Sequence, residues 1–351
     1  MLRSPVRKLR IHEHGRLEVE LDQETVRELQ FRYCEAINVV PVRGDRCVIH
    51  ATSYVGTVVT SNLEIRILPK CQVKSLLYMM SYAYRLGQIG REIIENIETD
   101  DVRDFILAIF AGQLEDLVRR GLRRGYLELE DELAVLRGRL LVDRQMRGVP
   151  RRDLSLSCRF EDYTADLPRN QVLRFALEQT GGTADANLNR RLHRLRRLLS
   201  VVSRKVFTVT DIDTFKYDRL DRHYRPLHAL CRLILAARGV EHEAGGYPVG
   251  SFLVNMNALF EGFVKSWMEQ NLPKGWTLTS QRRSWLDETR QIMIQPDMVM
   301  VRDGVPVLVI DTKYKIVQKG IPVTADAYQV LAYCRALGIE NAALVYPEWI
   351  G

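Results

Sequence analysis

The chain has 351 residues, 46% of them hydrophobic, and a formal net charge of +7 at pH 7. This length and composition exclude a disordered chain and predict two or three domains with separate cores. No apolar run approaches the roughly twenty residues of a membrane span. The basic N-terminal residues lack the apolar segment of a signal peptide, so we expect a cytoplasmic protein with no membrane association.

Alternation of apolar and polar residues characterises the first part of the chain. It predicts strands at residues 17–21, 48–51, 56–59 and 63–67. We therefore expect a small β-rich N-terminal module over residues 1–71.

Helical periodicity dominates from residue 72 to about residue 240. Apolar residues recur every three or four positions over residues 76–86, 102–122, 171–179, 188–202 and 224–237. A stretch with Gly245-Gly246 and Pro248 then separates this middle region from residues 241–351. The predicted fold class is α+β multidomain, with a β-rich module, a mainly helical middle region and a C-terminal α/β domain.

Positive charge is concentrated in the middle region. Residues 119–205 contain 20 basic and 11 acidic residues, a net charge of +9, against +7 for the whole chain. In the predicted helix at 188–202, the faces beside the apolar stripe carry Arg190, Arg191, Arg194, Arg196 and Arg197, of which Arg190, Arg194 and Arg197 are the candidates for contact with DNA. Such a face fits contact with a phosphate backbone, and it equally fits ordinary solvated surface.

The cysteine pattern favours reduced, mostly buried thiols. Six cysteines lie far apart, without a Cys-x-x-Cys pair or a histidine pair at zinc spacing. No Gly-x-Ser-x-Gly nucleophile motif occurs either.

Two acidic residues and a lysine lie at the ends of two adjacent predicted strands near the C-terminus. Asp297 follows Pro296 and precedes a strand that turns at Asp303-Gly304; the returning strand alternates so that Asp311 and Lys313 point to one side. Paired carboxylates are what an oxygen-ligated Mg²⁺ requires. With Lys313 orienting or deprotonating water, or binding a phosphate oxygen, the pattern suggests phosphodiester cleavage.

This pattern resembles the PD-(D/E)xK nuclease motif, with Pro296-Asp297 as its first part and Asp311-Thr312-Lys313 as its second. The motif is short, so a β-hairpin with solvated charges is an alternative interpretation.

The flanking residues favour the nuclease interpretation. An apolar stripe from Met256 to Trp267 predicts a helix, and Glu261 at its margin could be a third metal-binding carboxylate or an ordinary surface glutamate. A later helix, 325–337, carries Gln329 and Tyr333 on one face. This Gln-x-x-x-Tyr resembles the RecB-like branch of the same superfamily, which implies contact with DNA; core packing is the alternative for Tyr333. With strands at 277–282 and 342–346, the order is α-β-β-β-α-β.

The chain as a whole resembles the McrC family, the nuclease subunits of McrBC modification-dependent restriction systems. The motifs that carry this resemblance occur in order as Tyr54-Val-Gly56-Thr-Val, Glu64-Ile-Arg-Ile-Leu-Pro69-Lys70, Arg137-Gly138-Arg-Leu, Asp166-Leu-Pro-Arg-Asn170-Gln-Val-Leu and Leu259-Phe260-Glu261. The resemblance implies a Mg²⁺-dependent endonuclease subunit in which Asp297, Asp311, Lys313 and Glu261 form the catalytic and metal site.

The resemblance also implies a partner, an McrB-like AAA+ GTPase hexamer that acts with the nuclease on double-stranded DNA carrying modified bases. No Gly-x-x-x-x-Gly-Lys-[Ser/Thr] loop occurs here, so the motor is expected to be a separate chain. The N-terminal module is either the docking portion or a scaffold for the nuclease. A non-catalytic DNA-binding subunit that activates a partner NTPase remains an alternative, since a fold alone does not establish chemistry. A nuclease of another branch, for repair or transposition, is a third.

Overall fold

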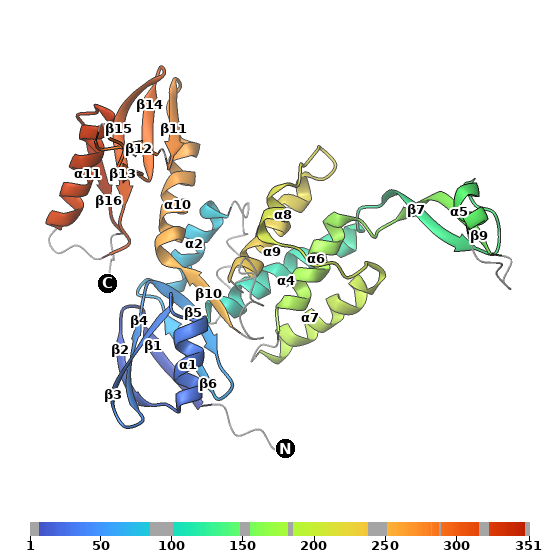
Figure 1. Cartoon of the computed structure of the whole chain (residues 1–351), viewed down its shortest axis with the longest axis horizontal. Coiled ribbons are helices and arrows are strands. Elements are labelled where there is room, and N and C mark those ends of the chain that lie inside the picture. Colours follow the sequence, from blue (N-terminus) through green and yellow to red (C-terminus); the bar gives the residue numbers. More distant parts are fainter. Residues whose placement is uncertain are drawn as a thin grey trace. The chain divides into compact units, whose positions relative to one another are not determined.

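The computed structural model describes residues 7–84, 101–147, 155–181, 185–237, 251–281, 283–287, 289–315 and 323–347. They form a mixed α/β structure (Figure 1) divided into two compact units, Met1–Ile106 with Ala236–Gly351, and Leu107–Leu235. The N-terminal module and the C-terminal region thus fall in one unit, whereas three domains were expected. The expected boundary at 241–250 lies outside the described residues. None of the described helices has the length and hydrophobicity of a membrane span.

The first unit begins with two sheets that contain all four predicted N-terminal strands. In spatial order, one sheet contains β1 (Arg7–His12), β6 (Leu63–Leu68), β5 (Tyr54–Val59) and β10 (Phe252–Asn255), and the other contains β2 (Arg16–Glu20), β4 (Arg46–Ala51) and β3 (Ile37–Arg43).

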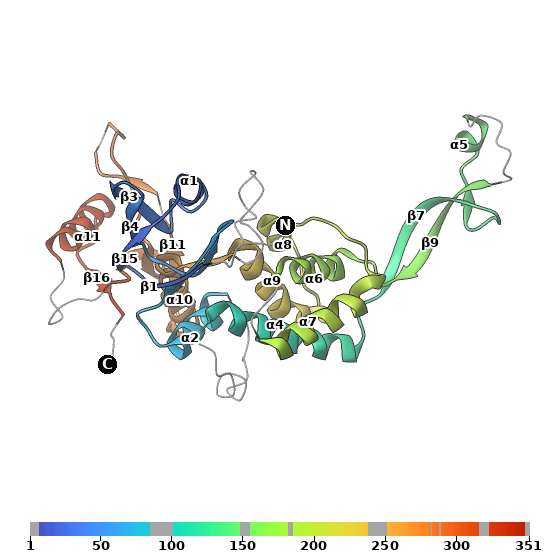
Figure 2. The ribbon, with the colours of Figure 1, turned by 90° about the horizontal axis from the view of Figure 1, so that it is seen from below.

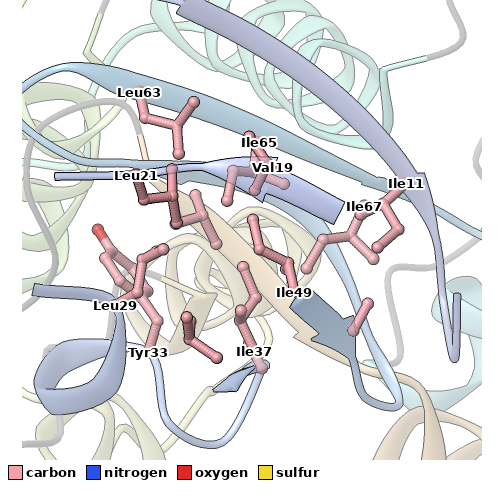
Figure 3. Close-up of a cluster of buried hydrophobic side chains, with 14 of the residues drawn as sticks. Ile11, Val19, Leu21, Leu29, Tyr33, Ile37, Ile49, Leu63, Ile65 and Ile67 are labelled. Carbon is pink, nitrogen blue, oxygen red and sulfur yellow. The ribbon is translucent and has the colours of Figure 1, made fainter. Parts of the chain in front are cut away.

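A short helix, α1 (Gln23–Arg32), packs against these sheets and was not predicted. Leu29 of this helix lies in one fully buried cluster with Ile49 and Ile65 (Figure 3). Burial of each such side chain stabilises the folded state by roughly 1.5–3 kcal/mol.

Strand β10 attaches the N-terminal sheet to the C-terminal region, because it pairs with β5 and leads directly into helix α10 (Met256–Asn271). Gly56 makes this pairing possible. Its φ is +127°, and a Cβ at this position would lie 2.0 Å from the carbonyl oxygen of Phe252. Only glycine can occupy such a position without displacing the neighbouring strand.

The C-terminal region follows the predicted α-β-β-β-α-β order. After α10 come β11 (Trp276–Ser280), β14 (Met298–Arg302), β15 (Val305–Thr312), α11 (Thr324–Leu337) and β16 (Ala342–Val345), and the sheet order is β11-β14-β15-β16. Asp303 and Gly304, both with positive φ, form the predicted tight turn between β14 and β15. A small hairpin, β12 (Ser284–Trp285) with β13 (Met293–Ile294), was not predicted.

The predicted helix at 76–86 is α2 (Val73–Ala83), and it belongs to the first unit. The second unit contains the other predicted middle helices and an unpredicted β-hairpin. Its predicted helices are most of α4 (Val102–Arg120), α6 (Pro168–Gln179), α7 (Ala186–Leu198) and most of α9 (Arg225–Ala237), and the short α8 (Val209–Asp213) was not predicted. The hairpin consists of β7 (Gly125–Leu133) and β9 (Leu156–Thr164), with β8 (Arg139–Leu140) beside β9 and α5 (Val142–Arg147) near its tip. Figure 2 shows it extending away from this unit's helices.

Asn170, from one of the middle motifs, holds the base of this hairpin to the helices. Its buried amide donates hydrogen bonds to the carbonyl oxygens of Arg123 and Ala165, and its carbonyl accepts one from Tyr224 at 2.8 Å. The motif therefore has a structural role in this unit.

Candidate active site

The ends of β14 and β15 place Asp297 beside the strand that contains Asp311. Met298 is paired with Ile310 in the antiparallel sheet. Asp297, which precedes Met298, therefore lies opposite Asp311, which follows Ile310. The backbone N–H and the hydroxyl of Thr312 both donate to Asp297 Oδ2 at 2.7 Å. These bonds fix the carboxylate and leave Oδ1 available for a ligand.

Asp311 is buried and lies against Lys313. The Lys313 ammonium is 2.6 Å from Asp311 Oδ2, and the two side chains are 24% and 1% exposed. The approach is off the hydrogen-bonding direction, so this contact is an ion pair and Oδ2 has no directed hydrogen bond among the described residues. Burial raises the pKa of Asp311, opposed by the Lys313 ammonium and reinforced by the Asp297 charge.

The Lys313 ammonium is stabilised in its charged form. Burial alone would lower the pKa of Lys313, but contact with Asp311 and the negative charges of Asp311 and Asp297 raise it above its ordinary value.

Glu261 faces the same group of charges from helix α10. Burial raises the pKa of Glu261, and the negative charges of Asp297 and Asp311 raise it further. We call Asp297, Asp311 and Glu261, together with Lys313, the acidic site.

Gln281, which sequence reasoning missed, connects two members of the acidic site. Its backbone N–H donates to the Asp297 carbonyl at 2.9 Å, and its side chain donates to Glu261 Oε1 at 3.2 Å. Its φ of +50° is unusual for a residue other than glycine. Its place at the end of the predicted first strand gave no signal of this role.

Gln329 and Tyr333 lie one helical turn apart on α11, as predicted. The Gln329 amide donates to the Tyr333 hydroxyl at 2.6 Å. The Tyr333 ring belongs to the buried core of this region, as the packing alternative required. Burial and the negative charge of Asp311 raise the pKa of Tyr333, so the charge of the acidic site acts on its hydroxyl.

The acidic site has the donor chemistry for a hard cation. Three carboxylates outnumber one ammonium, and Asp311 Oδ2 is a buried oxygen without a directed hydrogen bond. Across the described ranges, no three acidic, histidine or cysteine side chains are gathered into a ready-made ligand set. Mg²⁺ is commonly held by one or two carboxylates and completed by water and phosphate oxygens, so Asp297 and Asp311 are the residues that could hold it.

The predicted arginines of the middle region lie on α7 in the second unit. Arg191 and Arg196 have structural partners: Arg191 forms an ion pair with Glu115 at 2.9 Å, and Arg196 donates to Thr180. By contrast, Arg190, Arg194 and Arg197 are exposed and have no hydrogen bond or ion pair with the part of the chain that the structure describes. We call these three residues the α7 basic face.

Comparison with known proteins identifies the family. The family model described as "McrBC 5-methylcytosine restriction system component" matches residues 49–347. The chain belongs to this McrBC family. The match includes every residue of the acidic site and the α7 basic face, and it confirms the family resemblance drawn from the short motifs. No curated protein matches the chain.

Solved McrBC assemblies share the fold of this McrBC family chain. A chain of a half-complex from the tetradecameric assembly of Thermococcus gammatolerans McrB AAA+ hexamers with bound McrC is 22% identical, with a TM-score of 0.64 over 97% of this chain and 87% of that chain. A chain of the Thermococcus gammatolerans McrBC complex is also 22% identical, with a TM-score of 0.51 over 76% of this chain and 88% of that chain.

Proposed function

We propose that this chain is the Mg²⁺-dependent endonuclease subunit of an McrBC-type restriction complex, with a C-terminal PD-(D/E)xK nuclease domain. The observation that carries the proposal is the placement of Asp297, Asp311 and Lys313 at adjacent strand ends, with Glu261 facing them from α10. Membership of a restriction family supports the same substrate class.

Each residue of the acidic site has a proposed role in phosphodiester hydrolysis. Asp297 and Asp311 would hold the metal, and Glu261 would supply the third negative charge. A bound Mg²⁺ would lower the pKa of water and neutralise charge on the phosphate. Lys313, which lies 2.6 Å from Asp311, would orient or deprotonate the attacking water or bind a phosphate oxygen.

The partner and target follow from the family and its solved assemblies. McrC is bound to McrB AAA+ hexamers in the solved half-complex. We propose that this chain likewise acts with a hexameric McrB-type GTPase, stimulates its GTP hydrolysis and cleaves double-stranded DNA that carries methylated bases. Gln329 and Tyr333 would contact the DNA beside the acidic site, and the α7 basic face would contact its backbone elsewhere.

We expect the purified chain with its GTPase partner, GTP and Mg²⁺ to cleave 5-methylcytosine-containing DNA and to leave unmodified DNA intact. Chelation of Mg²⁺ should abolish cleavage, because the carboxylates would then lack the cation that neutralises the phosphate. The chain alone should leave both DNAs intact. Gel analysis of the products checks each result, and cleavage in the chelator would contradict the proposal.

Replacing Arg190, Arg194 and Arg197 together with glutamine should weaken binding to any duplex sequence. Each lost phosphate contact lowers the slope of log K against log salt by about 0.9 in magnitude, so the slope should fall by roughly two to three. Fluorescence anisotropy at several salt concentrations measures this. The triple lysine variant keeps the charge and serves as the control; an unchanged slope in the glutamine variant would exclude this face from DNA contact.

A further inference from the structure

A buried glutamate of the N-terminal module, Glu13, forms a hydrogen bond with Tyr314, the residue that follows Lys313. Glu13 directly follows β1 and is 1% exposed. Its Oε1 accepts a hydrogen bond from the backbone N–H of Lys70 at 2.7 Å and another from the Tyr314 hydroxyl at 3.0 Å. Residues 13 and 314 both belong to the first unit.

Tyr314 lies next to Lys313 in the sequence and packs against the residue that precedes Glu261. It is 7% exposed and adjacent in sequence to Lys313, whose backbone N–H donates to the Val345 carbonyl at 2.9 Å. Its ring packs against Phe260 with centroids 5.9 Å apart, and Phe260 immediately precedes Glu261 on α10. A fixed Tyr314 side chain therefore restrains the backbone that carries Lys313 and packs beside the turn that carries Glu261.

Packing alone would not require a carboxylate at position 13. The second oxygen of Glu13 is buried and has no hydrogen-bond partner among the described residues. Such an atom is costly, and an apolar side chain of similar size would fill the space without that cost. What the carboxylate provides is an acceptor that Lys70 fixes in place and that faces Tyr314.

We propose that Glu13 is a positioning residue of the nuclease: through the Tyr314 hydroxyl, it holds the backbone at Lys313 so that the Lys313 ammonium stays beside Asp311. The proposal rests on the proposed nuclease function and adds the N-terminal module to its active-site machinery. Glu13 lies outside residues 49–347, which the family model matches.

The test compares Tyr314→Phe, Glu13→Ala and Glu13→Gln with the wild-type chain, each in complex with the GTPase partner. Tyr314→Phe removes only the hydroxyl and keeps the ring on Phe260. We expect kcat for cleavage to fall about tenfold, with KM for DNA unchanged, because small misplacements of a reacting group cost this much or more. Glu13→Gln keeps an acceptor and should cleave nearly as fast as wild type, whereas Glu13→Ala should resemble Tyr314→Phe.

Hydrogen exchange of a peptide covering residues 307–315 gives a readout that is independent of cleavage. The Lys313 amide should exchange faster in Tyr314→Phe, while peptides elsewhere in the first unit remain unchanged. Tyr54→Phe is the matched control, because the Tyr54 hydroxyl donates to Glu35 at 2.7 Å within the N-terminal module. Neither its cleavage nor its exchange at Lys313 should change.

The outcomes separate this inference from the proposed function. If wild type cleaves DNA and Tyr314→Phe matches it in both kcat and exchange at Lys313, the positioning role is wrong and the nuclease proposal stands. If wild type does not cleave, the nuclease proposal fails, and the exchange experiment alone decides whether Glu13 and Tyr314 hold Lys313.

Discussion

Replacing Asp311 with asparagine should abolish DNA cleavage while GTPase stimulation by the complex remains. The change removes a proposed metal ligand and the charge that faces Lys313, so the cleavage rate should fall on the order of 10³-fold or more. Product formation and GTP hydrolysis are measured in the same reaction. Retained stimulation would show that the variant folds and docks, and unchanged cleavage would remove Asp311 from the mechanism.

The same variant should be at least as stable as the wild-type chain. Because the folded-state pKa of Asp311 is raised, the ionised carboxylate destabilises the folded state at neutral pH. Asparagine removes that penalty, and the difference should shrink as pH falls and the wild-type carboxyl becomes protonated in both states. Thermal unfolding at pH 7 and pH 4 checks the sign.

Asp326 gives the matched control, since it is another buried acid of this region and pairs with a lysine. It lies 2.6 Å from Lys315 and accepts a hydrogen bond from Tyr346 at 2.7 Å. Burial opposes ionisation, but these two contacts lower the pKa of Asp326. Asp326→Asn should therefore lose stability at neutral pH, the loss disappearing toward low pH, and should keep most of its cleavage. Asp311→Asn should thus lose cleavage without losing stability, whereas Asp326→Asn should lose stability and keep most of its cleavage.

The core of the acidic site was predictable because local rules determine it. Successive side chains of a strand point to opposite sides, which sets the side of Asp311 in β15, and the Asp303-Gly304 turn sets its neighbour strand. The apolar stripe of α10 was also predicted, but Trp267 at its end is 45% exposed. It lines an apolar groove of about 680 Å³ rather than the core.

Contacts between distant parts of the sequence could not be predicted. Gln281 reaches Glu261 from the end of a strand, and Glu13 reaches Tyr314 across the whole chain. The β7–β9 hairpin was missed although the sequence carries a signal for it: β7 alternates half-buried leucines with exposed acidic residues, the pattern of a strand with one face exposed. Helix α1 buries little besides Leu29 and Thr25, which leaves its periodicity too sparse to recognise.

Replacing Gly56 with alanine should destabilise the first unit by about 3 kcal/mol or more, since it combines backbone strain with a steric clash. The new Cβ would lie 2.0 Å from the Phe252 carbonyl oxygen and force β5 away from β10. Gly44→Ala separates these two effects, because Gly44 also has a positive φ, +58°, but nothing lies within 4 Å of its added Cβ. It should cost only about 1 kcal/mol. Denaturant unfolding of both variants measures the difference, and equal stabilities would show that the clash with Phe252 adds no cost to the backbone strain.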